Sequence, residues 1–552
     1  MKIRVLTIAA LALATAACGT SRTANQMAEP AITEQAYRGY IAALASDAFE
    51  GRAPSSEGEK RTVEYLEQQF VDLGLQPANG GSFRQDVPMV RITARPGTTH
   101  LSFDGTGKHL ELASHDDMEI VTRHVVGQVN VKDSPVVFVG YGIVAPEYGW
   151  NDYAGVDMHG KTALILVNDP GFATGDPKLF HGRTMTYYGR WTYKYEEAAR
   201  QGAAAAIIIH ETAPAAYPWS VVQNGWSGPQ FYADTPDGNA GRAAIEGWIT
   251  LDRARQVLAL AGQDLGKLQQ AAAQQGFRPV PLDITAAAGL SNDIRHTSSP
   301  NVVAMLPGKQ SPGECVIYMA HWDHFGMAPT GEGDRIFNGA QDNATGVAGI
   351  LTIARAYRAM LTLPARTVLF VATTGEEAGL IGAGYLANHP LCPLAKTAAL
   401  INLDLLNPLG RARDVQVIGF GASQLEDRLA AAAARHGRRL TPDATPEAGY
   451  FYRADQLPFA RKGVPSLYIK SGTDLIGKPP GTGQAMVDDY YAHTYHKQAD
   501  NYDPSWDVSG SIEDLKLLFE VGEGIADDGS WPNWYPGNEF RAARDASKAA
   551  RQ

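Results

Sequence analysis

Two adjacent carboxylates, Glu376 and Glu377, closely follow a short apolar run at residues 367–374 that is rich in β-branched side chains. Such a run, bounded by Gly375, predicts a buried strand. Neighbouring side chains in an extended loop point in different directions, so one carboxylate can bind a metal ion while the other transfers a proton. For this pair taken alone, a solvated loop with two acids is the alternative.

Further potential metal ligands follow other predicted strands. His321 and Asp323 come after one apolar run, and Asp404 comes after another. Asp342 lies at a glycine-flanked turn that precedes a helical pattern. Because sites in open α/β sheets form outside the carboxyl ends of the strands, we expect these side chains and the Glu pair to form one convergent site.

Length and composition indicate a folded protein with more than one domain. The chain has 552 residues, which gives room for about two or three domains. Hydrophobic residues make up 44% and charged residues 19%, as in globular proteins. The net charge of −11 argues against a nucleic-acid-binding protein, which needs a basic surface.

The N-terminus has the pattern of an export signal. Residues 1–17 contain two cations, no acid and an apolar core, and small residues precede Cys18. This segment is too short to be a permanent membrane-spanning helix. The small residues before Cys18 resemble a bacterial lipobox, which predicts a lipid anchor on Cys18 at the periplasmic side of a bacterial cell envelope. Ordinary cleavage, giving a free periplasmic or secreted enzyme, is the alternative.

Composition along the chain predicts a main domain with an inserted module. Apolar-periodic helices near the start would cover a sheet whose strands come later. A stretch of short strands and Gly-, Trp- and Tyr-rich loops has a different character. The predicted order is a signal at 1–18, a tether at 19–33, the first part of the main domain at 34–130, the insertion at 131–285, the main part at 286–530, and a peripheral tail at 531–552.

The remaining cysteines and histidines have simpler interpretations. Two cysteines beyond Cys18 do not make a disulfide-stapled fold. We expect Cys315, in a strand run, to be a small buried apolar side chain, and its pairing with Cys392 stays open. We interpret four histidines as structural or surface residues, not ligands: His181, His210, His324 and His493.

Taken together, the motifs are similar to those of a known family. They are His321-Trp-Asp323, Gly339-Ala-Gln-Asp342-Asn, Gly375-Glu376-Glu377, Asn402-Leu-Asp404, Tyr452-Arg-Ala-Asp455 and Tyr495-His496-Lys-Gln-Ala-Asp500. In this order, they resemble the secreted zinc aminopeptidases of the M28 metallopeptidase family, in the subgroup with an inserted protease-associated (PA) domain. The resemblance implies an α/β fold, with a mixed central β-sheet flanked by helices and an inserted β-rich PA-like domain.

The resemblance also implies two zinc ions, which cobalt or manganese could replace. His321 and Asp404 would hold one ion, Glu377 and His496 would hold the other, and Asp342 would bridge both. This donor set is chemically suitable, because zinc takes nitrogen and oxygen ligands in proteins.

Further roles follow from the same resemblance. Glu376 would act as general base toward a water that bridges the two metal ions. Asp323 would fix the imidazole of His321, and Asp500 would play a similar orienting part. Tyr452 would supply the oxyanion donor.

The chain departs from the family at two positions that are not presumed ligands. Gln456 stands where the family usually has His, and Gln341 stands where it often has Asp. We therefore expect altered surroundings at these positions and no loss of metal.

The function that we expect is hydrolysis of N-terminal residues from peptides with a free N-terminus. A carboxypeptidase, a glutaminyl cyclase on the same fold, and an inactive binding protein of the cell envelope remain alternatives. The complete set of ligands disfavours the cyclase, and the presence of Glu376 disfavours the inactive protein. The absence of a Gly-x-Ser-x-Gly elbow and of His-Glu-x-x-His disfavours serine hydrolases and single-zinc proteases of that motif.

Overall fold

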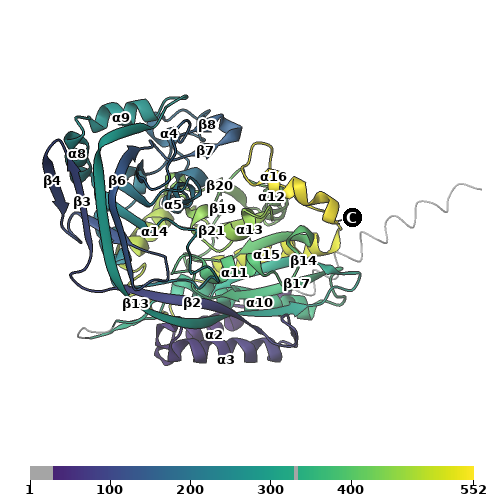
Figure 1. Ribbon diagram of the computed structural model, residues 1–552. Coiled ribbons are helices and arrows are strands. Elements are labelled where there is room, and N and C mark those ends of the chain that lie inside the picture. Colours follow the sequence, from purple (N-terminus) through teal and green to yellow (C-terminus); the bar gives the residue numbers. More distant parts are fainter. Residues whose placement is uncertain (1–28, 329–332, 552) are drawn as a thin grey trace, which may run out of the picture. The chain divides into compact units, whose positions relative to one another are not determined.

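The computed structural model describes residues 29–328 and 333–551, and this part of the chain forms two compact units (Figure 1). The first unit comprises the described residues up to Asp86, Ser299–Asp443, and those from Ala454 onward. The second unit comprises Val87–Ser298 and Ala444–Arg453.

A mixed β-sheet forms the centre of the first unit. In spatial order its strands are the end of β13 (Val280–Leu306), then β17 (Arg366–Thr373), β14 (Ser311–His321), β18 (Thr397–Asn402), β21 (Ser466–Ser471), β19 (Asp414–Val417) and β20 (Arg439–Pro442). Strands β17, β14, β18 and β21 are parallel, whereas β13 is antiparallel to β17 and β19 is antiparallel to β21. The expected mixed sheet is confirmed.

Helices cover both faces of this sheet. The main ones are α2 (Glu34–Leu44), α3 (Glu57–Asp72), α10 (Thr345–Ala359), α11 (Ile381–Asn388), α12 (Leu425–Arg435) and α15 (Ser509–Asp527). On β14, Val316 and Tyr318 pack into one apolar cluster with the helices α2, α3, α10, α12 and α15. Ile317 and Met319 pack into the other cluster, with α11. This alternation follows from the two-residue period of a strand, and it explains why the central strands are apolar throughout.

The second unit has its own sheet and core. Its parallel strands are β6 (Gln128–Phe138), β9 (Thr162–Leu166), β10 (Ala205–His210) and β12 (Ile245–Thr250). We had expected residues 87–130 in the main domain, but they belong to this unit. The reason is β-pairing over a long sequence distance, since β3 (His100–Gly105) pairs with residues 284–289 of β13. The relation of the second unit to PA domains stays a prediction.

Cys315 and Cys392 form a disulfide. Cys315 lies near the start of the apolar part of β14, and Cys392 follows α11; their Cα atoms are 6.5 Å apart, within the span of a disulfide. Cys315 is buried in the apolar core, as expected, and the pairing with Cys392 that the sequence left open is present.

The C-terminal segment is part of the first unit and is not a peripheral tail. Trp534 is fully buried, and the Arg544 side chain donates hydrogen bonds to the carbonyl oxygens of Thr397, Ala398 and Pro532. Its Ala- and Arg-rich composition had suggested an exposed segment. That prediction failed because the contacts that bury the segment come from residues far away in the sequence.

None of the helices in the described ranges is long and apolar enough to span a membrane. The expected signal at residues 1–18, with Cys18, lies outside the described residues.

The packing of Trp534 can be tested by mutation. Trp534→Ala should lower the free energy of unfolding by about 3–5 kcal/mol, because it leaves a large cavity in the core. The exposed Lys548→Ala should change it by less than about 0.5 kcal/mol. Denaturant unfolding of both variants measures this, and equal stability of the two would contradict the packing.

Candidate metal centre

The candidate ligands lie where neighbouring elements end. β14 ends at His321, Glu377 lies four residues beyond the end of β17, and Asp404 lies two residues beyond the end of β18. Because these strands are parallel neighbours, their carboxyl ends lie at one edge of the sheet. Asp342 lies in the short segment Ala340–Ala344 directly before α10, where its own backbone is not helical, and His496 follows α14 (Thr482–His493).

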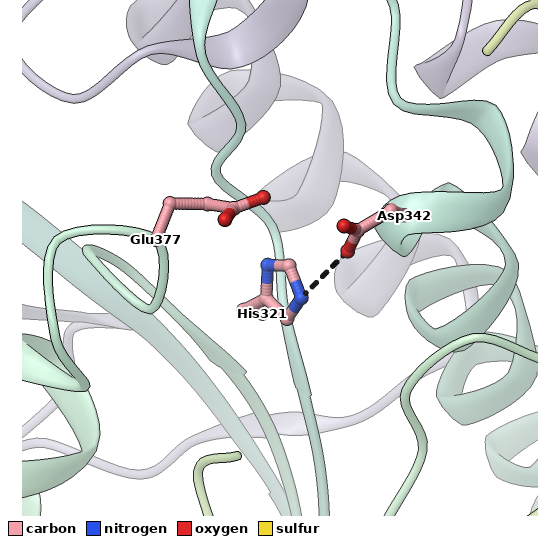
Figure 2. Close-up of side chains that lie close together, drawn as sticks. All are labelled: His321, Asp342 and Glu377. Carbon is pink, nitrogen blue, oxygen red and sulfur yellow. Dashed lines mark ion pairs between the residues drawn. The ribbon is translucent and has the colours of Figure 1, made fainter. Parts of the chain in front are cut away.

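The carboxylate of Asp342 lies between two histidines. Its Oδ1 is 3.3 Å from Nε2 of His321, and its Oδ2 is 3.1 Å from Nε2 of His496. A further carboxylate stands next to each histidine. Asp404 Oδ1 is 3.6 Å from Nε2 of His321, and Glu377 Oε2 is 3.3 Å from Nε2 of His496. Figure 2 shows the side chains of His321, Asp342 and Glu377 converging from three different segments.

The site has excess negative charge in a buried position. His321, Asp342 and Asp404 are all buried. No Lys or Arg within the described ranges forms an ion pair with the carboxylates of Asp342, Asp404 or Glu377. A buried carboxylate without a counter-charge is costly, so this cluster calls for a cation.

The donor set fits a metal ion. His321, Asp342 and Glu377 each offer a ligand atom, and these atoms lie within 4.8 Å of one another. Nε2 of His496 is buried and makes no hydrogen bond, although two carboxylates stand near it. Imidazole nitrogen and carboxylate oxygen are the ligands that zinc takes in catalytic sites.

The pKa values reflect the same imbalance. Burial alone would lower the pKa of His321, but the field of Glu376, Asp342 and Asp404 outweighs it and raises the pKa well above the usual value. Burial would raise the pKa of Asp342, but its contacts with the two histidines lower it well below the usual range. Burial raises the pKa of Glu377 to about 8. A bound cation would stabilise the ionised carboxylates.

Asp323 holds the loop that carries the Glu pair. Its Oδ1 accepts the backbone N–H of Glu376 at 3.1 Å, and its Oδ2 accepts that of Glu377 at 3.4 Å. Nδ1 of His321 is 3.1 Å from the backbone carbonyl oxygen of Asp323 but 3.9 Å from its carboxylate. The imidazole is thus oriented by the carbonyl group of Asp323, whereas we had expected the carboxylate.

Asp500 supports the central carboxylate in a similar way. Its Oδ1 accepts the backbone N–H of Gln341 at 3.0 Å, and its Oδ2 accepts that of Asp342 at 3.1 Å. Asp500 therefore positions Asp342, and no contact between Asp500 and His496 is found within the described ranges. The side chain of Gln341 accepts a hydrogen bond from Asn407 at 2.9 Å, away from the two histidines.

Sequence reasoning missed two residues that support the site. Nδ1 of His324 is 2.6 Å from Oε1 of Glu377, so His324 contacts a candidate ligand. Its only signal was its place directly after Asp323. Arg52 is buried and donates hydrogen bonds to the carbonyl oxygens of Asn338 and Gly339, just before Asp342. Nothing in the local sequence of Arg52 indicates this role.

The other candidates lie elsewhere. Tyr452 belongs to the second unit, where its ring centroid is 6.3 Å from that of Tyr187, and its role as oxyanion donor stays a prediction. His210 is buried, with Nε2 3.2 Å from the carbonyl oxygen of Tyr217. His493 is exposed and contacts Asp489 at 2.8 Å.

Comparison with known proteins agrees with the metal-binding donor set. Residues 301–519, which contain all five candidate ligands, match the family described as Peptidase family M28. This part of the chain is an M28 peptidase domain.

Similar proteins have been described in fungi. A probable zinc metalloprotease of Pyrenophora teres f. teres is 38% identical over 106 residues, which are 19% of this chain and 22% of that protein. A vacuolar membrane protease of Schizophyllum commune is 25% identical over 264 residues, 48% of this chain and 26% of that protein. The chain thus spans about a quarter or less of these relatives' lengths.

Two solved structures are among the matches to this chain. An aminopeptidase from Aneurinibacillus sp. strain AM-1 is 20% identical, with a TM-score of 0.49 over 91% of this chain and 95% of that one. A peptidase M28 precursor from Shewanella amazonensis is 17% identical, with a TM-score of 0.42 over 94% of this chain and 98% of that one.

The contact of His324 with Glu377 predicts a loss of metal affinity on substitution. Burial lowers the pKa of His324 to about 4, so the neutral ring can donate its Nδ1–H to Glu377. Nε2 of His324 has no hydrogen-bond partner, so Phe removes only the bond to Glu377. His324→Phe should lower zinc affinity about 10–100-fold, measured by competition with a chelator.

The matched control for this experiment is His493→Phe on α14, which should bind zinc as the native protein does. Equal zinc affinity of the His324 and His493 variants would show that His324 does not support the ligand.

Proposed function

We propose that the protein is a zinc-dependent exopeptidase that removes N-terminal residues from peptides with a free N-terminus. The observation that carries the proposal is the Asp342 carboxylate, which lies between one pair formed by His321 and Asp404 and another formed by His496 and Glu377. The M28 peptidase domain supports peptide-bond hydrolysis, and the resemblance of the motifs to M28 aminopeptidases supports action at the N-terminus.

The same geometry supports two metal positions. His321 and Asp404 would hold one zinc ion, Glu377 and His496 would hold the second, and Asp342 would contact both. Bound zinc would polarise the scissile carbonyl group and lower the pKa of a water molecule. One carboxylate oxygen of Asp342 faces each histidine, as a shared ligand requires.

Glu376 would accept the proton of the attacking water and transfer it to the leaving amine. Burial and the neighbouring carboxylates Glu377, Asp404 and Asp455 raise its pKa well above the usual value, although His321 opposes them. A carboxylate with a raised pKa is a stronger base, which suits this role. Asp323 fixes the backbone of Glu376 and so limits where that carboxylate can lie.

The proposal includes export to the bacterial cell envelope, with a lipid on Cys18. The pattern of residues 1–17 supports it. The disulfide between Cys315 and Cys392 also supports it, because disulfides persist mainly in exported proteins.

The proposed activity can be tested by mass spectrometry of peptides incubated with the zinc-loaded protein. The mixture contains peptides with free and with acetylated N-termini, some of which begin with Gln. Stepwise shortening of the free N-termini alone is expected. Shortening from the other end would indicate a carboxypeptidase, loss of ammonia from N-terminal Gln would indicate a cyclase, and no change would contradict a peptidase.

Substitution of Glu376 separates catalysis from metal binding. Glu376→Gln should keep the zinc content but lower kcat about 10²–10⁴-fold, because the amide cannot accept the proton. Elemental analysis and peptide turnover measure the two properties. Turnover near that of the native protein would contradict the assignment of Glu376 as the base.

Substitution of Asp342 tests the shared ligand. Asp342→Ala should lose at least one zinc ion per chain, because its carboxylate faces both histidines. Asp334→Ala, which removes an exposed carboxylate nearby in the sequence, serves as control. Unchanged zinc content of the Asp342 variant by elemental analysis would exclude the shared role.

A further inference from the structure

Among the described residues, one buried arginine of the second unit forms no hydrogen bond or ion pair through its side chain, and its guanidinium group contacts only the ring of Trp191, 5.8 Å from the ring centroid. Arg190, directly before α5 (Trp191–Arg200), is only 6% exposed. Its Nε is buried without a hydrogen bond. Among the described residues, no hydrogen bond or ion pair of its side chain is found. Guanidinium groups carry five N–H donors, and a buried charge without a partner is costly.

The other buried arginines of the described ranges show how this chain normally satisfies such a group. Arg52 and Arg544 donate to several backbone carbonyl oxygens. Arg366 and Arg438 each pair with a carboxylate and also donate to backbone carbonyl oxygens. Nε and Nη1 of Arg438 also lack a hydrogen bond, but its charge is paired with Asp514. Among these five residues, only Arg190 has neither an ion pair nor a hydrogen bond through its side chain.

The acidic side chains nearby in the sequence are already paired. Asp169 accepts the hydroxyl hydrogen of Thr186 at 2.8 Å and also backbone N–H groups. Glu197 forms an ion pair with Arg200 at 2.6 Å. No carboxylate among these is left to neutralise Arg190.

A second positive charge lies near the first. Burial and the charge of Arg453 together lower the pKa of Arg190 to about 9, although Tyr217 opposes them. Arg453 lies over the ring of Tyr217, at 6.0 Å from its centroid. Two guanidinium groups thus lie close enough to repel each other, and no carboxylate neutralises Arg190. Such a concentration of positive charge attracts an anion.

The local backbone also favours an anion. α5 begins directly after Arg190, and no side chain caps its N-terminus by a hydrogen bond. The N-terminal end of a helix carries a partial positive charge that stabilises anions.

We propose that Arg190, with Arg453 near it, binds the carboxylate group of a ligand on the second unit. A carboxylate matches the planar guanidinium fork through two parallel hydrogen bonds. The small exposed fraction of Arg190 favours this flat, singly charged group over a phosphate, which is tetrahedral and needs more donors. The carboxylate could belong to the free C-terminus of a peptide or to an acidic side chain. The proposal does not depend on the proposed peptidase activity.

The first experiment uses the full chain and small probes. Binding of benzoate, of the uncharged benzamide and of inorganic phosphate is measured by calorimetry. Benzoate should bind saturably to the native protein, and benzamide and phosphate should not. Arg190→Met should weaken benzoate binding at least tenfold. Arg95→Met should not, because Arg95 is an exposed arginine of the same unit that pairs with Asp293.

Equal benzoate affinity of the Arg190→Met variant would overturn the proposal. Binding of benzamide as tight as that of benzoate, or of phosphate in its place, would also overturn it. Circular dichroism shows whether Arg190→Met folds. If it does not, Arg190→Lys replaces it, since Lys keeps the charge but not the two-pronged hydrogen bonds, and weaker benzoate binding is again expected.

A second experiment distinguishes the sources of the carboxylate. Three short peptides are compared, all N-acetylated so that an N-terminal exopeptidase cannot shorten them. One has a free C-terminus and no acidic residue, one is amidated and contains Glu, and one is amidated and uncharged. Arg190-dependent binding of the peptide with a free C-terminus, or of the peptide with Glu, supports the site and identifies its ligand. Equally tight binding of the uncharged peptide would overturn the proposal.

Discussion

Negative charge buried without a matching positive side chain is the constraint on which the first unit depends. Asp342, Asp404 and Glu377 meet around two histidines, and among the described residues the basic groups in close contact with these carboxylates are histidines, whereas the buried Arg52 acts on Asp342 and Glu377 from further away. In a low-dielectric interior this arrangement is unfavourable unless a cation joins it. The sheet, the helices and the supporting hydrogen bonds can be understood as the scaffold that keeps these groups together.

Much of that scaffold acts on the backbone and not on the ligand atoms. Asp323 binds the N–H groups of Glu376 and Glu377, Asp500 binds that of Asp342, and Arg52 binds the carbonyl oxygens just before Asp342. These buried charged groups fix the loops at the carboxyl ends of the strands. A site that is held in this way needs little rearrangement on binding a metal ion, because the loops already lose their conformational entropy when the chain folds.

The sequence predicted what is encoded locally. Apolar runs followed by His321, Glu377 and Asp404 marked the parallel strands and their ends, and the glycine-flanked turn marked Asp342. Features that depend on distant contacts were missed. Residues 87–130 pair with strands that come much later, Trp534 and Arg544 pack against segments far away in the sequence, and Arg52 reaches a loop that lies 286 residues further on. The second unit shows the same limit, because only the fold reveals that Arg190 forms no side-chain hydrogen bond or ion pair with the described residues.

Anomalous diffraction from crystals of the zinc-loaded protein tests the central claim most directly. The account predicts two zinc peaks in the first unit, one next to His321 and Asp404 and the other next to His496 and Glu377, with the carboxylate of Asp342 between them. A single peak, or peaks that avoid Asp342, would contradict the claim that this buried carboxylate is shared by two metal ions.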